Sequence, residues 1–467
     1  MLKTMSLVNF KAFKDSGTVD LKKINVFLGQ NSSGKSSFLK ALLILKNTLH
    51  ENDNNTALYL NNDTGPFGSI LYGKSDKPHI TFEMGFDDNE KISEFRDVLN
   101  DKTFITLMLV RMKKNIKTFN EYEEVAKKEF VNYTKNSIKT VKVTFKETQK
   151  KPSTVEEFEL TFSNKDTCRI YMERNAYYIQ YNDFNFKNKP NLLLPNKFLF
   201  DFNLTKTHNI NDHDADMLFK ILLAIKEVEV KLQNFAKRVI HIEPFRDKPE
   251  RLKLITNFKF NSVGSRGENT ISTLIGLDNE SNTNSKRSNV TIKKSMNKWL
   301  NEFDLAETIE VEESKNNQYL LTVTNKYTGI KCNIADVGVG TSQLLPIIIE
   351  SINTPNDTVL FIEEPETHIH PNAQAKLGQL FVDCALKQNK SFFIETHSMY
   401  LVKQLQISVA KGDIKADDVG IYYFQQSSEG TNIKNLKLQG NGQFAEEIPK
   451  GFFDVPFNLS NELRKYL

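Results

Sequence analysis

The feature that most constrains the fold of this chain is a glycine-rich loop between an apolar strand and an apolar helix. Residues 29–36 read Gly-Gln-Asn-Ser-Ser-Gly-Lys-Ser, which is the pattern G-x-x-x-x-G-K-S. The preceding segment Ile24–Leu28 has the composition of a short strand, and Ser36–His50 has that of a helix. A strand, a glycine-rich loop and a helix in this order predict a phosphate-binding loop. A chance glycine-serine turn is the alternative, but it would not explain the flanking elements.

The residue types in this loop suit a nucleotide triphosphate and its metal. Gly29 and Gly34 let the backbone curl so that successive N–H groups face one point, and the following helix adds its N-terminal partial positive charge. Lys35 can supply charge to the β- and γ-phosphates, and the Ser36 hydroxyl can ligate Mg²⁺. We therefore expect ATP and Mg²⁺ as cofactors. The expected contacts are Gly29, Asn31, Ser33, Gly34, Lys35, Ser36 and Ser37.

Two adjacent carboxylates follow a second apolar strand. Glu363 and Glu364 come directly after the run Val-Leu-Phe-Ile. Because ligands of open α/β sheets bind at the carboxyl ends of the strands, we expect both side chains at the nucleotide. Glu363 is expected to hold Mg²⁺ through water, and Glu364 to orient or deprotonate the attacking water. An acidic loop without function is the alternative, which the presence of the phosphate loop disfavours.

Histidines follow this pair and another core strand. His368 and His370, with Glu366, do not have the spacing of a zinc site, so we expect them to support the site or to contact a second subunit. His397 follows the strand-like run 391–394 and is expected to contact the γ-phosphate and sense its loss. A lone histidine is more often structural, so only its place after a core strand favours the functional role.

A second glycine-containing segment begins another helix. Residues 336–343 read Asp-Val-Gly-Val-Gly-Thr-Ser-Gln and lead into an apolar run, which is typical of an anion site at a helix N-terminus. One nucleotide rarely needs two such sites. We therefore expect this one to bind the γ-phosphate of a nucleotide held by another subunit, and so a homodimer or a higher homo-oligomer. A plain helix cap remains the alternative. The expected contacts are Gly338, Gly340, Ser342 and Gln343.

The periodicity along the chain predicts an α/β protein of three parts. Period-two alternation in residues 141–145, 158–162 and 177–181 predicts antiparallel strands, whereas alternating strands and helices over residues 359–410 predict a parallel sheet covered by helices. We divide the chain into residues 1–90 and 236–467, the two halves of one nucleotide-binding fold, and an α+β insertion at residues 91–235. Residues 278–289 are polar and are expected to form a mobile loop.

Composition excludes several classes of protein. With 62 basic and 58 acidic residues, the balance gives no evidence for nucleic-acid binding by the whole chain. The Lys-rich segment 111–151 could bind DNA, but such runs are more often solvated faces, and acidic residues interrupt this one. The three cysteines have no metal-ligand spacing, and no apolar run approaches the ~20 residues that span a bilayer. We therefore expect a cytoplasmic protein without a membrane partner.

Together the four motifs resemble the ABC-type ATPase heads of the SMC and RecF kind, most of all the bacterial branch typed as AAA15/AAA21 or OLD-like. The resemblance implies an ABC-ATPase head with a mixed β lobe and a parallel-sheet core that carries the phosphate loop. It gives Lys35, Ser36, Glu363, Glu364 and His397 the roles stated above. The family's Leu-Ser-Gly-Gly-Gln signature is absent, so the resemblance does not decide which residue of 338–343 faces the γ-phosphate.

The resemblance also implies partners. ATPases of this branch often occur in two-gene anti-phage systems such as PARIS and Septu, as sensors and scaffolds. The implied partners are an effector nuclease of the Toprim or HNH type from an adjacent gene, and a phage-encoded trigger. Residues 398–467 contain no Asp-x-Asp pair, so we expect no nuclease activity in this chain. A RecF- or SMC-like ATPase of DNA repair is the alternative, although the long heptad insertion of SMC proteins is absent.

Overall fold

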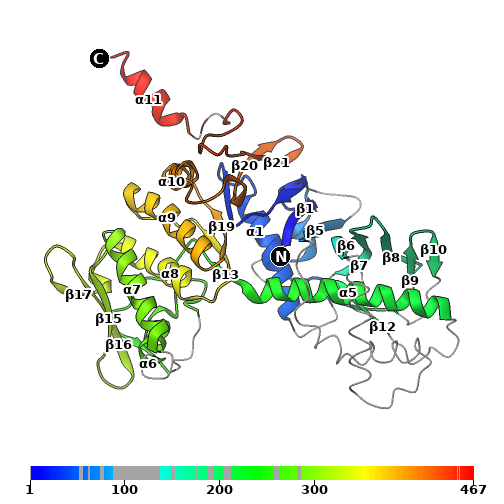
Figure 1. Ribbon diagram of the computed structural model, residues 1–467, viewed down its shortest axis with the longest axis horizontal. Coiled ribbons are helices and arrows are strands. Elements are labelled where there is room, and N and C mark those ends of the chain that lie inside the picture. Colours follow the sequence, from blue (N-terminus) through cyan, green and yellow to red (C-terminus); the bar gives the residue numbers. More distant parts are fainter. Residues whose placement is uncertain are drawn as a thin grey trace. The chain divides into compact units, whose positions relative to one another are not determined.

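The structure is a computed structural model of the chain. It describes residues 2–51, 56–61, 64–73, 78–87, 137–148, 153–174, 176–186, 193–202, 212–256, 262–280, 286–449, 451 and 453–466. Two compact units divide the chain. The first comprises Met1–Leu21, Ser37–Lys237 and Gln426–Asn432, and the second comprises Lys22–Ser36, Arg238–Gln425 and Ile433–Leu467 (Figure 1).

The second unit contains a six-stranded sheet that positions the predicted site. Its order is β13-β18-β19-β4-β20-β21, with bounds β13 Val239–Ile242, β18 Val359–Glu363, β19 Ser391–Glu395, β4 Ile24–Gly29, β20 Val419–Ser427 and β21 Gly430–Asn435. The pairs β13–β18, β18–β19, β19–β4 and β4–β20 are parallel. Since parallel strands end at the same edge, the phosphate loop after β4 and the polar residues that end β18 and β19 meet there.

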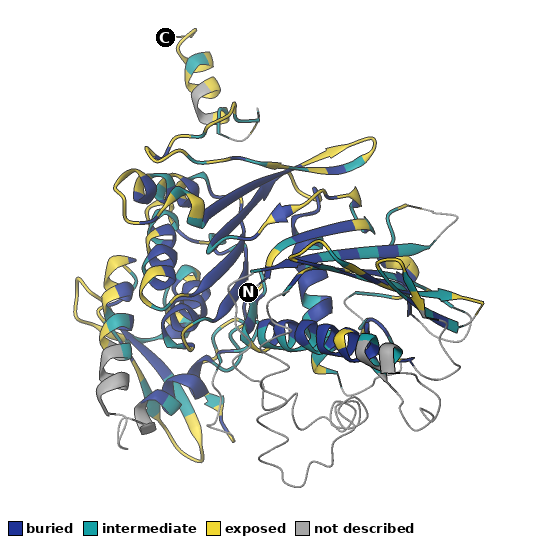
Figure 2. Cartoon of the chain, turned by 45° about the vertical axis from the view of Figure 1, so that its right-hand side comes forward, coloured by how far each residue is buried: buried dark blue, intermediate teal, exposed yellow. Residues whose placement is uncertain are grey.

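Burial explains why these segments are strands. Every residue of β4, β18 and β19 is buried, and their runs of Val, Ile, Leu and Phe are typical of parallel strands covered on both faces. Figure 2 shows these strands in dark blue. The helices of this unit include α8 (Val339–Asn353), α9 (Pro371–Lys387) and α10 (Met399–Ala410). Pro371 is the first residue of α9, and the Ser398 hydroxyl accepts a hydrogen bond from the Leu401 amide at the start of α10.

A smaller layer completes the second unit. The helices α6 (Thr270–Glu280) and α7 (Lys286–Glu302) share its apolar core with strands β15 (Thr308–Glu313) and β16 (Gln318–Thr324). Strand β16 lies between β15 and β14 (Lys253–Leu254), and it also pairs with β17 (Lys331–Asn333). Helix α11 (Val455–Leu463) follows near the C-terminus.

The first unit contains a nine-stranded sheet with the order β10-β9-β8-β7-β6-β5-β1-β2, in which β3 pairs with β1. Its strands are β1 Leu2–Phe10, β2 Phe13–Asp15, β3 Val19–Asp20, β5 His79–Phe86, β6 Ile138–Lys146, β7 Thr154–Phe162, β8 Thr167–Glu173, β9 Ala176–Tyr181 and β10 Phe184–Phe186. All its pairings are antiparallel. Helix α1 (Lys35–His50) enters this unit at Ser37, and the unit also holds the hairpin of β11 (Leu193–Asn196) and β12 (Leu199–Phe202). The long helix α5 runs from Asp212 to Arg238.

The α/β fold class is confirmed, with a parallel sheet for the phosphate loop and a separate antiparallel lobe. Strands β6 to β10 of the expected insertion continue the sheet of the N-terminal segment, because β6 hydrogen-bonds directly to β5. The expected loop at residues 278–289 is wrong at both ends, since α6 continues to Glu280 and α7 begins at Lys286. Most of the basic segment 111–151 lies outside the described residues. Among the helices that are described, none has the length and apolarity to cross a membrane.

Candidate nucleotide-binding site

The phosphate loop has the tight backbone that its glycines predict. Gly29 has a φ of 145°, Ser32 of 61° and Gly34 of 97°. A Cβ atom on Gly29 would lie 2.3 Å from the carbonyl oxygen of Phe424 and 2.8 Å from the Ser33 hydroxyl. Glycine is therefore required at position 29 by close backbone approach as well as by its φ angle.

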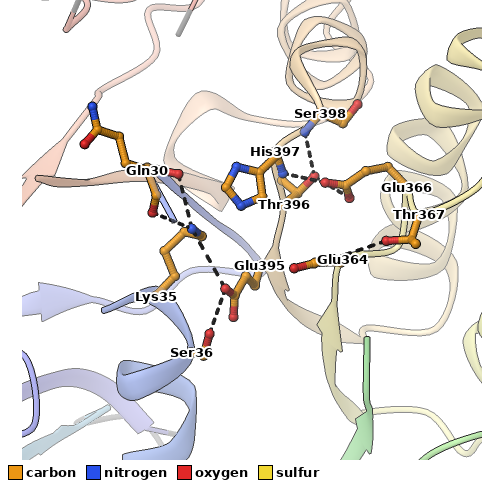
Figure 3. A network of polar contacts seen from close by, with 11 residues as sticks. Gln30, Lys35, Ser36, Glu364, Glu366, Thr367, Glu395, Thr396, His397 and Ser398 are labelled. Carbon is orange, nitrogen blue, oxygen red and sulfur yellow. Dashed lines mark hydrogen bonds and ion pairs between the residues drawn. The ribbon is translucent and has the colours of Figure 1, made fainter. Parts of the chain in front are cut away.

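The Lys35 ammonium lies inside this loop. Its side chain is 3% exposed, and Nζ donates to the carbonyl oxygens of Gly29 at 3.2 Å and Gln30 at 3.0 Å (Figure 3). Burial lowers the pKa of Lys35, which nearby carboxylates partly oppose. Two carbonyls only partly compensate a buried cation, so the loop holds positive charge that phosphate oxygens can neutralise.

Ser36, the expected Mg²⁺ ligand, is bonded to a carboxylate from a different strand. Its hydroxyl donates to Glu395 Oε1 at 2.8 Å, and the same oxygen lies 3.9 Å from Lys35 Nζ. Burial raises the pKa of Glu395 to about 7, and the charges of Glu363 and Glu364 act in the same direction. The sequence analysis gave Glu395 no role. Its place at the end of a core strand, in register with Glu363, is the signal that could have identified it.

Glu363 and Glu364 follow one another at the end of β18 but have different environments. Glu363 is buried, and its Oε1 lies 2.7 Å from Nε2 of His241 on the neighbouring strand β13. Glu364 has a φ of 45°, and its Oε2 accepts a hydrogen bond from the Thr367 hydroxyl at 3.3 Å. The two carboxylates thus have different hydrogen-bond partners, His241 and Thr367.

Arg246 supports the end of β18 through hydrogen bonds to its backbone. The residue is 5% exposed, and its guanidinium donates to the carbonyl oxygen of Glu363 at 2.7 Å and to that of Glu364 at 3.3 Å. Burial lowers its pKa to about 10, although Glu366, Glu364 and Glu363 oppose this shift. The group therefore stays charged at neutral pH. No role for Arg246 was predicted, because nothing local in its segment indicates a contact with β18.

Glu366 joins the loop after β18 to the loop after β19. It accepts hydrogen bonds from the Thr396 hydroxyl at 2.6 Å and from the backbone N–H of His397 (Figure 3). Burial raises the pKa of Glu366. Burial lowers the pKa of His397, and the charge of Lys35 acts in the same direction, whereas Glu364 opposes this shift. Glu366 therefore holds His397, the expected phosphate sensor, by a hydrogen bond to its backbone N–H. The imidazole ring takes no part in this hydrogen bond.

The second glycine segment lines a hollow of about 410 Å³ in the same unit. Gly338 caps α8 without a side-chain hydrogen bond, and a Cβ atom on Gly340 would lie 3.0 Å from the carbonyl oxygen of His368. Ser342 and Gln343 are buried, and their side chains donate to carbonyl oxygens of this chain, those of Val339 at 2.8 Å and Arg246 at 3.4 Å. The first turn of α8 faces the hollow, whereas the two polar side chains behind it face inward. The hollow's polar lining also includes Thr341, His370 and Asn372.

The residues at the sheet edge suit a magnesium–nucleotide complex. Within the described residues, no group of three or more His, Cys, Asp or Glu side chains is arranged to hold a metal ion by itself. Mg²⁺ in nucleotide sites takes one or two protein ligands and completes its shell with phosphates and water. Oε2 of Glu395 is buried and lacks a hydrogen-bond partner. This oxygen, beside Ser36, can therefore still accept a hydrogen bond or contact a cation. The donor set therefore fits the cation expected from the sequence.

Comparison with known proteins finds one curated relative and several solved structures that resemble the chain. An "ATP/GTP phosphatase" of Helicobacter pylori is 27% identical over 150 residues, a match that covers 27% of this chain and 40% of that protein. The match thus spans less than half of the relative's length. Solved structures that resemble the chain include the SMC head domain from Thermotoga maritima, with 10% identity, a TM-score of 0.37, and coverage of 94% of this chain and 99% of that one. An SMC head bound to the C-terminal winged-helix domain of ScpA has 10% identity, a TM-score of 0.40, and coverage of 94% and 98%.

The family comparison covers most of the chain and both halves of the site. Residues 1–402 match the AAA_15 family, described as an AAA ATPase domain. This range includes the phosphate loop, both acidic strand ends and His397. The chain therefore belongs to the AAA ATPase domain family.

Proposed function

We propose that this chain hydrolyses ATP with Mg²⁺ at a site completed by a second copy of itself, and that it serves as the sensor and scaffold subunit of an anti-phage system. The observation that supports hydrolysis is the meeting of three elements at one sheet edge. Lys35 and Ser36 of the phosphate loop contact the carboxylate of Glu395 on β19 (Figure 3). Glu364, which follows β18, donates its backbone N–H to the carbonyl oxygen of Glu395 at 2.8 Å. A phosphate-binding loop and a carboxylate beside it are what phosphoryl transfer to water needs.

Each residue has a separate task in this proposal. The loop amides and Lys35 bind the β- and γ-phosphates, and Ser36 and Glu363 hold the cation. The cation, when bound, offsets charge on the phosphate oxygens. Glu364 orients the attacking water and accepts its proton, and His397 contacts the γ-phosphate as a hydrogen-bond donor. Arg246 keeps the backbone of Glu364 in place.

The dimer follows from the second glycine segment. Gly340 and Thr341 of the first turn of α8 line a hollow, and His370, the N-cap residue of α9, lines it too. The N-terminus of a helix favours an anion, and two helices begin at this hollow. We propose that this anion is the γ-phosphate of the nucleotide held by the second copy.

The role in defence rests on the resemblance of the motifs to ATPase subunits of two-gene systems, AriA of PARIS and PtuA of Septu. In this role the ATP-bound oligomer holds a nuclease from an adjacent gene and releases it after a phage protein binds. A DNA-repair ATPase of the RecF or SMC kind is the competing proposal. It requires DNA affinity that falls steeply with salt, because phosphate contacts release counterions.

Catalytic substitutions test the ATPase proposal. Lys35→Ala removes the charge that faces the phosphates, so we expect ATP binding to be lost. Glu364→Gln keeps the side chain's size but cannot accept a proton, so we expect tight ATP binding, hydrolysis reduced about 100-fold or more, and accumulation of a dimer in size-exclusion chromatography with light scattering. Wild-type turnover by Glu364→Gln would show that another group activates the water.

Co-expression tests the defence proposal. The chain and the product of its neighbouring gene are expressed together, and phage plaque formation is compared for the wild type and for Lys35→Ala. Protection that needs both proteins and an intact Lys35 supports the proposal. Equal plaque counts in all strains, together with salt-sensitive DNA binding by the purified chain, would favour the repair ATPase instead.

A further inference from the structure

The nucleotide site contains a carboxylate with no assigned task. Glu395 ends β19 in register with Glu363 and is 5% exposed. Its Oε1 accepts the hydrogen bond of the Ser36 hydroxyl at 2.8 Å and lies 3.9 Å from Lys35 Nζ (Figure 3). Its Oε2 is buried without a hydrogen-bond partner. One side chain therefore touches both residues of the loop that are expected to meet the metal–phosphate complex.

The contact with Ser36 determines what the hydroxyl can do. A serine hydroxyl has one proton and two acceptor lone pairs. Because the proton is donated to Glu395, the lone pairs remain available to a cation. Carboxylates that accept a hydrogen bond from a metal ligand fix the orientation of that ligand and raise its basicity. The geometry between Glu395 and Ser36 is of this kind.

The position of Glu395 beside two other carboxyl groups has a second consequence. Glu363 and Glu364 end the neighbouring strand, so three carboxylates are gathered where phosphates are expected to bind. Like charges that share a buried site repel each other strongly because water screens them little. A nucleotide without a divalent cation would add further negative charge beside Glu395. A bound cation would offset this repulsion.

We propose that Glu395 orients the Ser36 hydroxyl toward Mg²⁺ and makes nucleotide binding depend on that cation. This inference rests on the proposed function, because it takes the loop to bind a magnesium nucleotide. Glu395 is a positioning residue here, since it acts through Ser36. It thereby couples two binding events, and the coupling can be measured without any hydrolysis.

The experiment measures the affinity of the full chain for the non-hydrolysable analogue AMP-PNP by calorimetry, once with Mg²⁺ and once with EDTA. For the wild type we expect much tighter binding with Mg²⁺. For Glu395→Gln we expect tighter binding than the wild type in EDTA, weaker binding in Mg²⁺, and a ratio of the two affinities reduced about 10-fold or more. Glu310→Gln, an exposed site on β15, makes the same charge change and should keep the wild-type ratio.

Two further variants separate orientation from charge. Glu395→Asp keeps the charge but shortens the reach to Ser36, so we expect weak binding in EDTA as in the wild type and weakened binding in Mg²⁺. In a double-mutant cycle, Glu395→Gln added to Ser36→Ala should alter the AMP-PNP affinity in Mg²⁺ far less than it does in the wild type. The reason is that the Ser36 hydroxyl, through which Glu395 acts, is absent from this background. Additive effects would mean that Glu395 does not act through Ser36.

The outcomes distinguish this inference from the function on which it depends. A folded Glu395→Gln variant with the wild-type affinity ratio would overturn the role of Glu395 and leave the ATPase proposal intact. A folded wild type that binds no nucleotide with Mg²⁺ would overturn the proposed function itself. Should thermal unfolding show that Glu395→Gln does not fold, the Glu395→Asp variant decides, and a wild-type ratio there counts against the proposal.

Discussion

Glu364 has a backbone conformation that residues with a side chain rarely adopt, and contacts on both sides of its peptide hold it there. Its φ is 45°, its N–H donates to the carbonyl oxygen of Glu395 at 2.8 Å, and its own carbonyl oxygen accepts from Arg246. A left-handed residue other than glycine costs about 1–2 kcal/mol. The direction of the carboxylate that we propose activates water is thus set in part by hydrogen bonds to the backbone of Glu364.

Substitution of Arg246 tests this at the scale of one residue. We expect Arg246→Ala to lower kcat about 10- to 100-fold, as a misplaced catalytic group does, with little change in nucleotide affinity. Arg246→Lys keeps the charge but not the planar fork, so it should recover only part of the rate. Steady-state kinetics and nucleotide calorimetry measure the two quantities separately. A loss of thermal stability with unchanged kcat would mean that Arg246 only supports the fold.

At the scale of the element, the turn from β4 into α1 depends on backbone packing against β20. A Cβ atom on Gly29 would collide with the carbonyl oxygen of Phe424, an atom that cannot move without displacing its strand. We expect Gly29→Ala to weaken ATP binding at least about 10-fold and to destabilise the fold by about 1–3 kcal/mol. Gly440→Ala is the matched control, because a Cβ atom there meets nothing within 4 Å. Equal nucleotide affinity for the two variants would contradict this account of the loop.

A buried cation directly precedes β19, and it predicts a pH dependence of stability. Lys390 is 0% exposed, its Nζ donates to the carbonyl oxygen of Ser351 at 2.7 Å, and burial lowers its pKa from 10.5 to about 8. Between these two values the unfolded chain binds more protons than the folded one, so stability rises with pH. Below about pH 8 the cost of the buried charge is fully present.

The measurement compares the wild type with Lys390→Met, which cannot titrate. From pH 7.5 to 9.5 we expect the wild type to gain about 2 kcal/mol relative to the variant in urea unfolding. The difference between the two proteins cancels the titration of all other groups that both contain. A difference that stays constant over this range would show that Lys390 titrates normally in the folded chain.

At the scale of the whole molecule, the proposal requires that each nucleotide site takes residues from two copies. The first turn of α8 is the segment that we expect to contact the nucleotide held by the second copy. Gly338 caps this helix, and a Cβ atom there meets nothing within 4 Å. A side chain at position 338 is therefore compatible with the folded chain. Aspartate is also a favourable N-cap residue, so its expected effect is confined to repulsion of phosphate.

This allows a complementation test. Gly338→Asp and Lys35→Ala should each lack ATPase activity alone, whereas an equal mixture should regain about a quarter of the wild-type rate. Random pairing makes about half of the dimers mixed, and each mixed dimer has one intact site out of two. Gly338→Asn, which has the same shape without the charge, should retain most of its activity. A mixture with no activity, under conditions where the chains exchange, would show that the sites are not shared.

The amino-acid sequence determined the parts that depend on local order. Glycine spacing, the apolar run of each core strand and the residues just after it are properties of short segments, so the phosphate loop, the acidic end of β18 and the place of His397 were all visible without a fold. The same holds for α1, which the composition of Ser36–His50 predicted to within one residue of its observed bounds. The loop expected at residues 278–289 was wrong because polar composition was taken as loop, whereas much of it continues α6 and α7.

Only the tertiary structure decided which of these segments touch. Ser36 and Glu395 are 359 residues apart in the chain, and Arg246 lies 117 residues before the carbonyl group it supports at Glu363. No pattern within a segment encodes such contacts, because the order of strands in the sheet brings them together. Parallel pairing of β18, β19 and β4 places three carboxyl ends at one edge, and burial there gives Glu395, Arg246 and Lys35 their shifted pKa values.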